Sequence, residues 1–169
     1  MKAILLSIFV FSFSLWGAEP KVVAIDNLQK RGKAGSQLTY IPNQDTPFTG
    51  KAVSYWPNGQ KAREWIYKDG KFDGVRTEWW QNGQKERAEN YKDGKEDGLF
   101  TIWYEDGQKE LEAIWKDGKQ MSAVVWKPNG EKCPVTKIDK EGNGVVALYN
   151  EDGSEMLRLT FKDGELVED

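Results

Sequence analysis

The stretch Tyr55–Gly74 reads YWPNGQKAREWIYKDGKFDG, and the chain then repeats it. Residues 79–98 read WWQNGQKERAENYKDGKEDG, and residues 103–121 read WYEDGQKELEAIWKDGKQM. The glycine in the first turn of each unit recurs after 24, 24, 23 and 23 residues, at Gly59, Gly83, Gly107, Gly130 and Gly153. Five turns at a near-constant period indicate a repeat array, in which a unit buries its apolar face only against its neighbours.

Each unit contains two turn signals separated by a strand-like run. A three-residue loop, Pro57-Asn58-Gly59, pairs Tyr55 with Lys61, and proline and glycine both suit such a loop. The second turn is Lys-Asp-Gly, as at Asp69-Gly70, which is again a hairpin signal. The sequence therefore predicts an all-β fold: an antiparallel β-hairpin repeat array, forming an elongated meander sheet of about five units of 23–24 residues.

Two positions of each unit are expected on the buried face of this sheet. They stand four residues before and eight residues after the turn glycine, and the three-residue loop places both on one face. The predicted core residues are Tyr55, Tyr67, Trp79, Tyr91, Trp103, Trp115, Trp126, Tyr149 and Phe161. Pairing is expected to be weakest in unit four, where Cys133-Pro134 removes a backbone donor.

The N-terminal part of the chain differs from the array. Residues 1–18, MKAILLSIFVFSFSLWGA, carry one positive charge and then a short apolar run, which is typical of a signal peptide. An uncleaved anchor or a buried N-terminal strand is the alternative for this run. Residues 19–50 contain the strand-like runs KVVAI and QLTYI and are expected to cap the repeat domain of residues 51–169.

Composition argues against several classes of function. The formal net charge is −3, without a basic block, which disfavours nucleic acid and anionic membranes as partners. The chain has no histidine and one cysteine, Cys133, so Ser–His or Cys–His catalysis is excluded and metal ligands are reduced to carboxylates. The sequence thus predicts no catalytic residues, no metal site and no cofactor.

The repeated pattern of an aromatic residue, Asn-Gly-Gln-Lys, a second aromatic residue and Lys-Asp-Gly resembles the short MORN-type repeat. The chain as a whole, together with Thr46–Gly50 at the entrance to the array, is similar to bacterial proteins labelled YwqK-type antitoxin. This resemblance implies an elongated sheet of β-hairpins and a binding or scaffolding role, and it implies no catalytic residues.

A second row of aromatic residues is the candidate binding site. If Tyr55, Trp79 and Trp103 point inward, the residue after each points outward, opposite a glutamine of the same hairpin. The predicted ligand-binding residues are Trp56, Gln60, Trp80, Gln84, Tyr104 and Gln108. Rings and amides at a regular spacing suit an extended peptide or a glycan, whereas the alternative is that the rings stack on neighbouring units.

Apolar residues of units four and five are expected on the same outer face: Ala123, Val125, Val146, Leu148 and Met156. A partner in a homodimer or a segment of the same chain would have to cover them. Taken together, the sequence predicts an exported, periplasmic or extracellular, non-enzymatic scaffold that binds a protein or a glycan on one face of its sheet. The alternatives are a self-assembling envelope protein and an antitoxin-like or immunity-like partner of a toxin.

Overall fold

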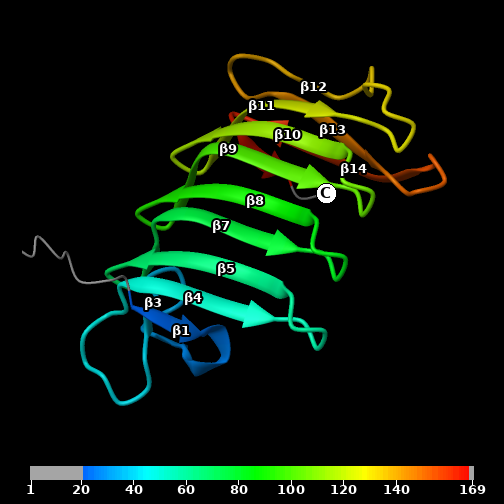
Figure 1. Cartoon of the computed structure of the whole chain (residues 1–169). Helices are drawn as coiled ribbons and strands as arrows, with labels where there is room; N and C mark the ends of the chain where they lie inside the picture. Colours follow the sequence, from blue (N-terminus) through cyan, green and yellow to red (C-terminus); the bar gives the residue numbers. More distant parts are fainter. Residues whose placement is uncertain (1–20, 168–169) are drawn as a thin grey trace, which may run out of the picture.

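The computed structural model describes residues 21–167, and the predicted signal peptide lies outside this range. Almost all regular structure is β-strand (Figure 1). The first elements are β1 (Val22–Ala24), a 3-10 turn (Ile25–Asn27), β2 (Gln29–Arg31), β3 (Leu38–Tyr40), β4 (Gly50–Tyr55), β5 (Lys61–Lys68), β6 (Lys71–Phe72) and β7 (Gly74–Trp79). The remaining strands are β8 (Lys85–Lys92), β9 (Lys95–Trp103), β10 (Lys109–Lys116), β11 (Lys119–Val125), β12 (Lys137–Ile138), β13 (Gly144–Tyr149), β14 (Glu155–Lys162) and β15 (Glu165–Val167).

The repeat units form one nine-stranded sheet in the order β1-β4-β5-β7-β8-β9-β10-β11, with the short β6 paired to β5. Successive strands from β4 to β11 are antiparallel, whereas β1 joins the edge parallel to β4. The predicted hairpin meander is therefore confirmed, and each unit contributes one long hairpin to it (Figure 1).

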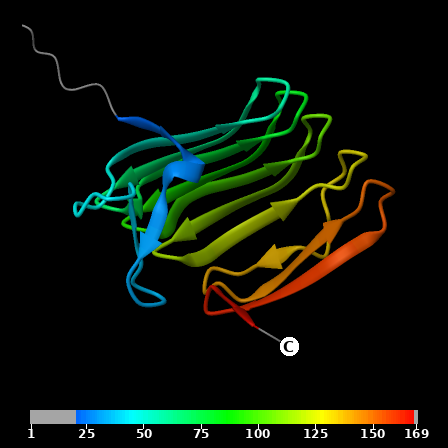
Figure 2. The same ribbon diagram turned by 90° about the horizontal axis from the view of Figure 1, so that it is seen from below.

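The meander does not continue into the last units as a single sheet. Strands β12 to β15 form a separate four-stranded sheet, and residues 126–136 between the sheets contain only the isolated bridge of Trp126 with Lys132. Pro134 lies in this segment and has no backbone N–H for a ladder. The connection therefore leaves the first sheet after β11, and the second sheet turns back beside it (Figure 2).

The two ends of the large sheet are packed on the same side. At one end, Phe48 and residues of the N-terminal segment, including Ile25, Leu28 and Ile41, pack around Ala52 and Tyr67. At the other end, Phe100, Leu111, Ala113 and Val125 of the large sheet pack against Val146, Tyr149 and Phe161 of the second sheet. Figure 2 shows the N-terminal segment and the second sheet on the same side of the large sheet.

A β-bulge after each three-residue loop decides which side chains share a face. Tyr55 pairs with Lys61 as the sequence predicts, but Ser54 then pairs with Arg63, so the register shifts by one residue. Because side chains alternate along a strand, a one-residue shift moves Tyr67 to the face opposite Tyr55. Tyr55 is 61% exposed and Tyr67 only 4%, so the prediction that both lie in the core is wrong for Tyr55.

The Lys-Asp-Gly turns are two-residue hairpins with both central residues in the left-handed region. Asp69 has φ 50° and Gly70 φ 79°, and Asp93, Asp117 and Asp163 have nearly the same φ as Asp69. Aspartate and glycine tolerate this conformation, and it matches the twist of the flanking strands. A side-chain oxygen of Thr49, Asp73, Asp97 or Asn143 accepts a hydrogen bond from the N–H of the turn aspartate.

Candidate binding surfaces

The register divides the large sheet into a covered face and an open face. We define the covered face by Ala52, Trp65, Arg76, Glu89, Phe100 and Ala113, which form a row across the strands. We define the open face by Val53, Glu64, Thr77, Ala88, Thr101 and Glu112, which form the row on the opposite side. The N-terminal segment and the second sheet both pack on the covered face.

The open face carries a row of alternating lysines and aromatic rings along one side of the sheet, which we call the Lys–Trp ladder. Lys61 pairs with Tyr55 in its own hairpin, and its ammonium lies 5.2 Å from the ring centre of Trp79 in the next one. Lys85 lies over Trp103 at 5.9 Å, and Lys109 lies over Trp126 at 5.8 Å. Cation–π contacts of this kind link each hairpin to the next and cover the rings of the half-buried tryptophans.

A second, apolar row on the open face lies closer to the Asp-Gly turns. Leu99 and Ile114 are directly opposite in β9 and β10, and they are 43% and 44% exposed. Val75 occupies the matching position on β7 and is also exposed, with Asn90 of β8 between it and Leu99. Neighbouring exposed aliphatic side chains on a regular sheet surface form a patch of the kind that marks interaction sites.

The predicted ligand-binding rings lie at the edge of the sheet formed by the three-residue loops. Trp56 donates from Nε1 to the carbonyl oxygen of Trp79 at 2.9 Å, and Trp80 donates in the same way to Trp103 at 3.3 Å. The hydroxyl of Tyr104 donates to the carbonyl oxygen of Trp126 at 2.8 Å. Each ring is half-buried and uses its polar hydrogen to hold the next unit, so this row joins successive units of the sheet.

The predicted glutamine partners lie across the loops, as their spacing suggests. The backbone N–H groups of Trp56, Trp80 and Tyr104 donate to the carbonyl oxygens of Gln60, Gln84 and Gln108, and these three glutamines are exposed. Asn58 and Asn82 add side-chain hydrogen bonds to backbone carbonyl groups of the following unit, at Gln81 and Glu105. The loop edge is thus a periodic set of contacts between units.

Removing one of these contacts should lower stability modestly. Tyr104→Phe deletes the hydroxyl that bonds to Trp126 and leaves the ring in place, so we expect a loss of about 1 kcal/mol in the free energy of unfolding. Tyr55→Phe is the matched control, because Tyr55 is mostly exposed, and it should change stability by no more than about 0.5 kcal/mol. Urea denaturation of both variants is the measurement, and equal effects would contradict a stabilising role of this hydrogen bond between units.

The other predicted core residues fall into two groups. Tyr67, Tyr149 and Phe161 are buried. Trp79, Tyr91, Trp103, Trp115 and Trp126 are half-buried. Because of the bulge, Trp79 and Trp103 lie on the open face, whereas Tyr91 and Trp115 lie on the covered face. Burial raises the pKa of Tyr67 to about 12, which is consistent with its position beneath the N-terminal segment.

The apolar residues of units four and five are largely covered by the chain itself. Val125 and Val146 are buried where the two sheets meet, and Ala123 and Leu148 pack against the same cluster. The sequence left open whether a homodimer partner or a segment of the same chain covers these residues. For these four, packing between the two sheets of the same chain provides the cover. Met156 remains exposed on β14.

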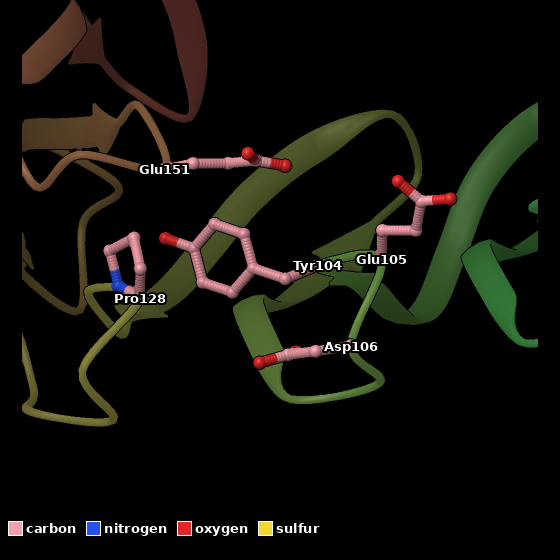
Figure 3. A pocket seen from close by; sticks show the side chains of 5 residues that line it. All are labelled: Tyr104, Glu105, Asp106, Pro128 and Glu151. Carbon is pink, nitrogen blue, oxygen red and sulfur yellow. The ribbon is translucent and has the colours of Figure 1, made fainter.

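A shallow acidic pocket lies at the loop edge of the last units. It measures about 430 Å³ and is lined by Tyr104, Glu105, Asp106, Pro128 and Glu151 (Figure 3). The Tyr104 hydroxyl is already bonded to Trp126, so the ring acts here as a wall. Among residues 21–167, no group of three or more His, Cys, Asp or Glu side chains is placed to hold a metal ion.

Comparison with protein families identifies the repeat. Residues 48–69, 72–93 and 96–117 match a family model described as a MORN repeat variant. These three units are MORN-type repeats. Each matched MORN repeat closes on itself, because its first residue, Phe48, Phe72 or Glu96, accepts a hydrogen bond at 2.8 Å from the glycine after its last residue. No curated protein gives a significant match to the chain.

The MORN match covers the first three hairpins of the large sheet, up to the turn that precedes β11. It therefore includes the Lys–Trp ladder from Tyr55 to Lys109 and the exposed apolar row. Within the described part of the chain, no helix is both long and apolar enough to cross a membrane.

Proposed function

We propose that this protein is a non-enzymatic scaffold that binds another protein through the open face of its MORN sheet. The observation that carries the proposal is the exposed row of Val75, Leu99 and Ile114 beside the Lys–Trp ladder. The stabilising packing of the N-terminal segment and the second sheet lies on the opposite face, which leaves this row exposed to solvent.

The chemistry of the open face favours a protein partner over a glycan. A sugar ring binds by stacking on an exposed aromatic face, but lysine ammonium groups already lie over Trp79 and Trp103. Aliphatic side chains surrounded by lysine and glutamate instead suit an interface with an apolar centre and a charged rim. Glu64, for example, lies between Lys51 and Lys61, at 3.1 Å and 2.6 Å, on this face.

Affinity capture with the full chain tests this proposal. The bait is the wild-type protein, with Leu99→Glu as the interface variant and Leu157→Glu, exposed on β14 of the second sheet, as the matched control. A charge in the centre of an interface should cost at least about 2 kcal/mol, or more than about tenfold in affinity. We expect a protein retained by the wild type and the control and lost from Leu99→Glu.

The same three proteins distinguish binding from self-assembly. If the open face serves copies of this chain, size-exclusion chromatography should show an oligomer that Leu99→Glu dissociates and Leu157→Glu does not. If all three baits capture the same proteins, the open face has no binding role. The same conclusion follows if no bait captures any protein. The antitoxin-like role implied by the family resemblance is one outcome of this capture, in which the retained protein is a toxin.

We also propose that the protein is exported. This proposal rests on the sequence of residues 1–18, in which one lysine precedes a short apolar run, as in a signal peptide. The mature chain should begin near Glu19 and lie in the periplasm or outside the cell. Mass spectrometry of the endogenous protein in separated cell fractions tests this, and an intact residue 1–18 segment in the cytoplasm would exclude it.

A further inference from the structure

The middle of the covered face carries charges instead of a packed core. Between the N-terminal segment at β4 and β5 and the second sheet at β9 to β11, strands β7 and β8 present Arg76, Glu78, Arg87 and Glu89. Arg63 of β5 lies directly opposite Glu78, so the row Arg63, Glu78, Arg87 crosses three strands. This strip, which we call the arginine trough, is flanked by a packed layer on each side.

The acidic members of the trough are both paired, and Glu89 is buried whereas Glu78 is half-buried. Glu89 is only 1% exposed and lies between Arg76, at 3.5 Å, and Arg87. Glu78 accepts a hydrogen bond from Arg76 at 2.7 Å. Burial by itself would lower the pKa of Arg76, but the hydrogen bond with Glu78 and the charge of Glu89 raise it. The carboxylates are therefore committed to holding the arginines in place.

The basic members are more accessible. The side chains of Arg63 and Arg87 are 52% and 43% exposed, and among residues 21–167 each has one carboxylate within ion-pair distance. Two of the three arginines lie over aromatic rings: Arg87 lies 4.9 Å from the ring centre of Phe100, and Arg76 lies 5.0 Å from that of Trp65. Guanidinium groups held on aromatic rings keep their remaining N–H donors directed at a ligand with little loss of side-chain entropy.

A pocket of about 340 Å³ lies next to Arg76 of the trough. This pocket lies between the N-terminal hairpin and the Asp-Gly turns, and Phe72 and Tyr91 line it next to Arg76. Lys30 and Lys71 add two further cations there, and Glu96 adds one carboxylate. Five basic groups thus face four acidic ones along the trough and pocket, since Glu86 also interacts with the charges of Arg63 and Arg87. The protein as a whole has a formal net charge of −3.

We propose that the arginine trough is a second binding site, which takes an extended acidic peptide lying along β7 and β8. Carboxylates of such a peptide would accept hydrogen bonds from the free donors of Arg63 and Arg87 and reach Lys30 and Lys71 at the other end. A chain of about six residues spans about 20 Å when extended, which exceeds the distance of about 13 Å along β8 from Arg87 to Tyr91 at the pocket. The site is on the face opposite the proposed protein-binding surface and does not depend on it.

Fluorescence anisotropy with a labelled oligoglutamate peptide of about six residues tests this inference. Oligolysine and oligo(Gly-Ser) peptides of the same length are the comparison probes. The site variant is Arg63→Ala with Arg87→Ala, which removes two half-exposed cations. The matched control is Lys137→Ala with Lys140→Ala, which removes two exposed cations at the second sheet. Circular dichroism and urea denaturation establish that each variant is folded.

We expect oligoglutamate to bind the wild type and the control with equal affinity. Its affinity for the Arg63/Arg87 variant should be lower by a factor of at least about ten. Raising the salt from about 50 to 300 mM should weaken binding, because part of the site is exposed. No binding of oligoglutamate at about 1 mM, or equal binding by both variants, would overturn the inference. Vesicles containing phosphatidylserine that bind through Arg63 and Arg87 when oligoglutamate does not would also overturn it, in favour of a membrane surface.

Discussion

Phe161→Ala should destabilise the protein by about 3–5 kcal/mol, the range typical of a buried phenylalanine reduced to alanine. Phe161 is 6% exposed and belongs to the cluster that joins the second sheet to the large sheet. Its ring meets Trp115 edge to face, with the centres 6.4 Å apart. Losing the ring removes contacts from both layers at once.

Denaturation in urea, followed by tryptophan fluorescence, measures this loss, and hydrogen exchange should show β12 to β15 opening first. Leu166→Ala is the matched control, since Leu166 pairs directly with Phe161 but is 51% exposed. It should change the free energy of unfolding by no more than about 0.5 kcal/mol. Equal losses for the two variants would mean that the second sheet is not held by this cluster.

Glu89→Gln should cost about 3 kcal/mol, because removing one member of a buried ion pair leaves an uncompensated charge. Glu89 is the partner shared by Arg76 and Arg87. Glutamine preserves the shape of the side chain, so the measured loss reports the charge rather than a cavity. The same variant should reduce binding of oligoglutamate if Glu89 positions the two arginines of the trough.

Glu86→Gln on the same strand is the control for the charge change. Burial, with a contribution from the charge of Glu78, raises the pKa of Glu86 above its usual value of 4.5. When the pKa of a carboxyl group is raised in the folded state, the free energy of unfolding of the protein falls as the pH rises past the unfolded pKa of that group. Its replacement should therefore be neutral or slightly stabilising at pH 7, with the gain disappearing below about pH 4.5. A larger loss for Glu86→Gln than for Glu89→Gln would contradict the assignment.

Local features of the fold could be predicted from particular residues. The recurrence of Gly59, Gly83 and Gly107 predicts the repeat, and Asp-Gly at Asp69-Gly70 predicts the second turn, which has both residues in the left-handed region. Pro57-Asn58-Gly59 predicts the pairing of Tyr55 with Lys61. These features depend on backbone preferences of a few adjacent residues, and such preferences act whatever the rest of the chain does.

The sequence predicted one buried face for all the aromatic core residues, and this prediction was wrong for Tyr55, Trp79 and Trp103. The bulge beside Ala62 adds one residue to a strand, and a single residue reverses the side of every later side chain. The bulge of each hairpin acts in this way. Together these bulges expose Tyr55, place Trp79 and Trp103 on the open face, and place the arginine trough on the covered face. No strong local signal marks such a bulge, since Lys61-Ala62 is an unremarkable dipeptide.

The sequence by itself thus determined the repeat, its two turns and the starting register of each hairpin, because these follow from residues close together in the chain. The tertiary structure decided the two faces of the large sheet and the return of β12 to β15 onto it. Val125 and Val146 are buried together although they lie on different sheets, and the charges around Glu89 are tolerated only because the arginines meet them from β7 and β8. Such contacts depend on the summed packing of distant strands, which no short stretch of sequence encodes.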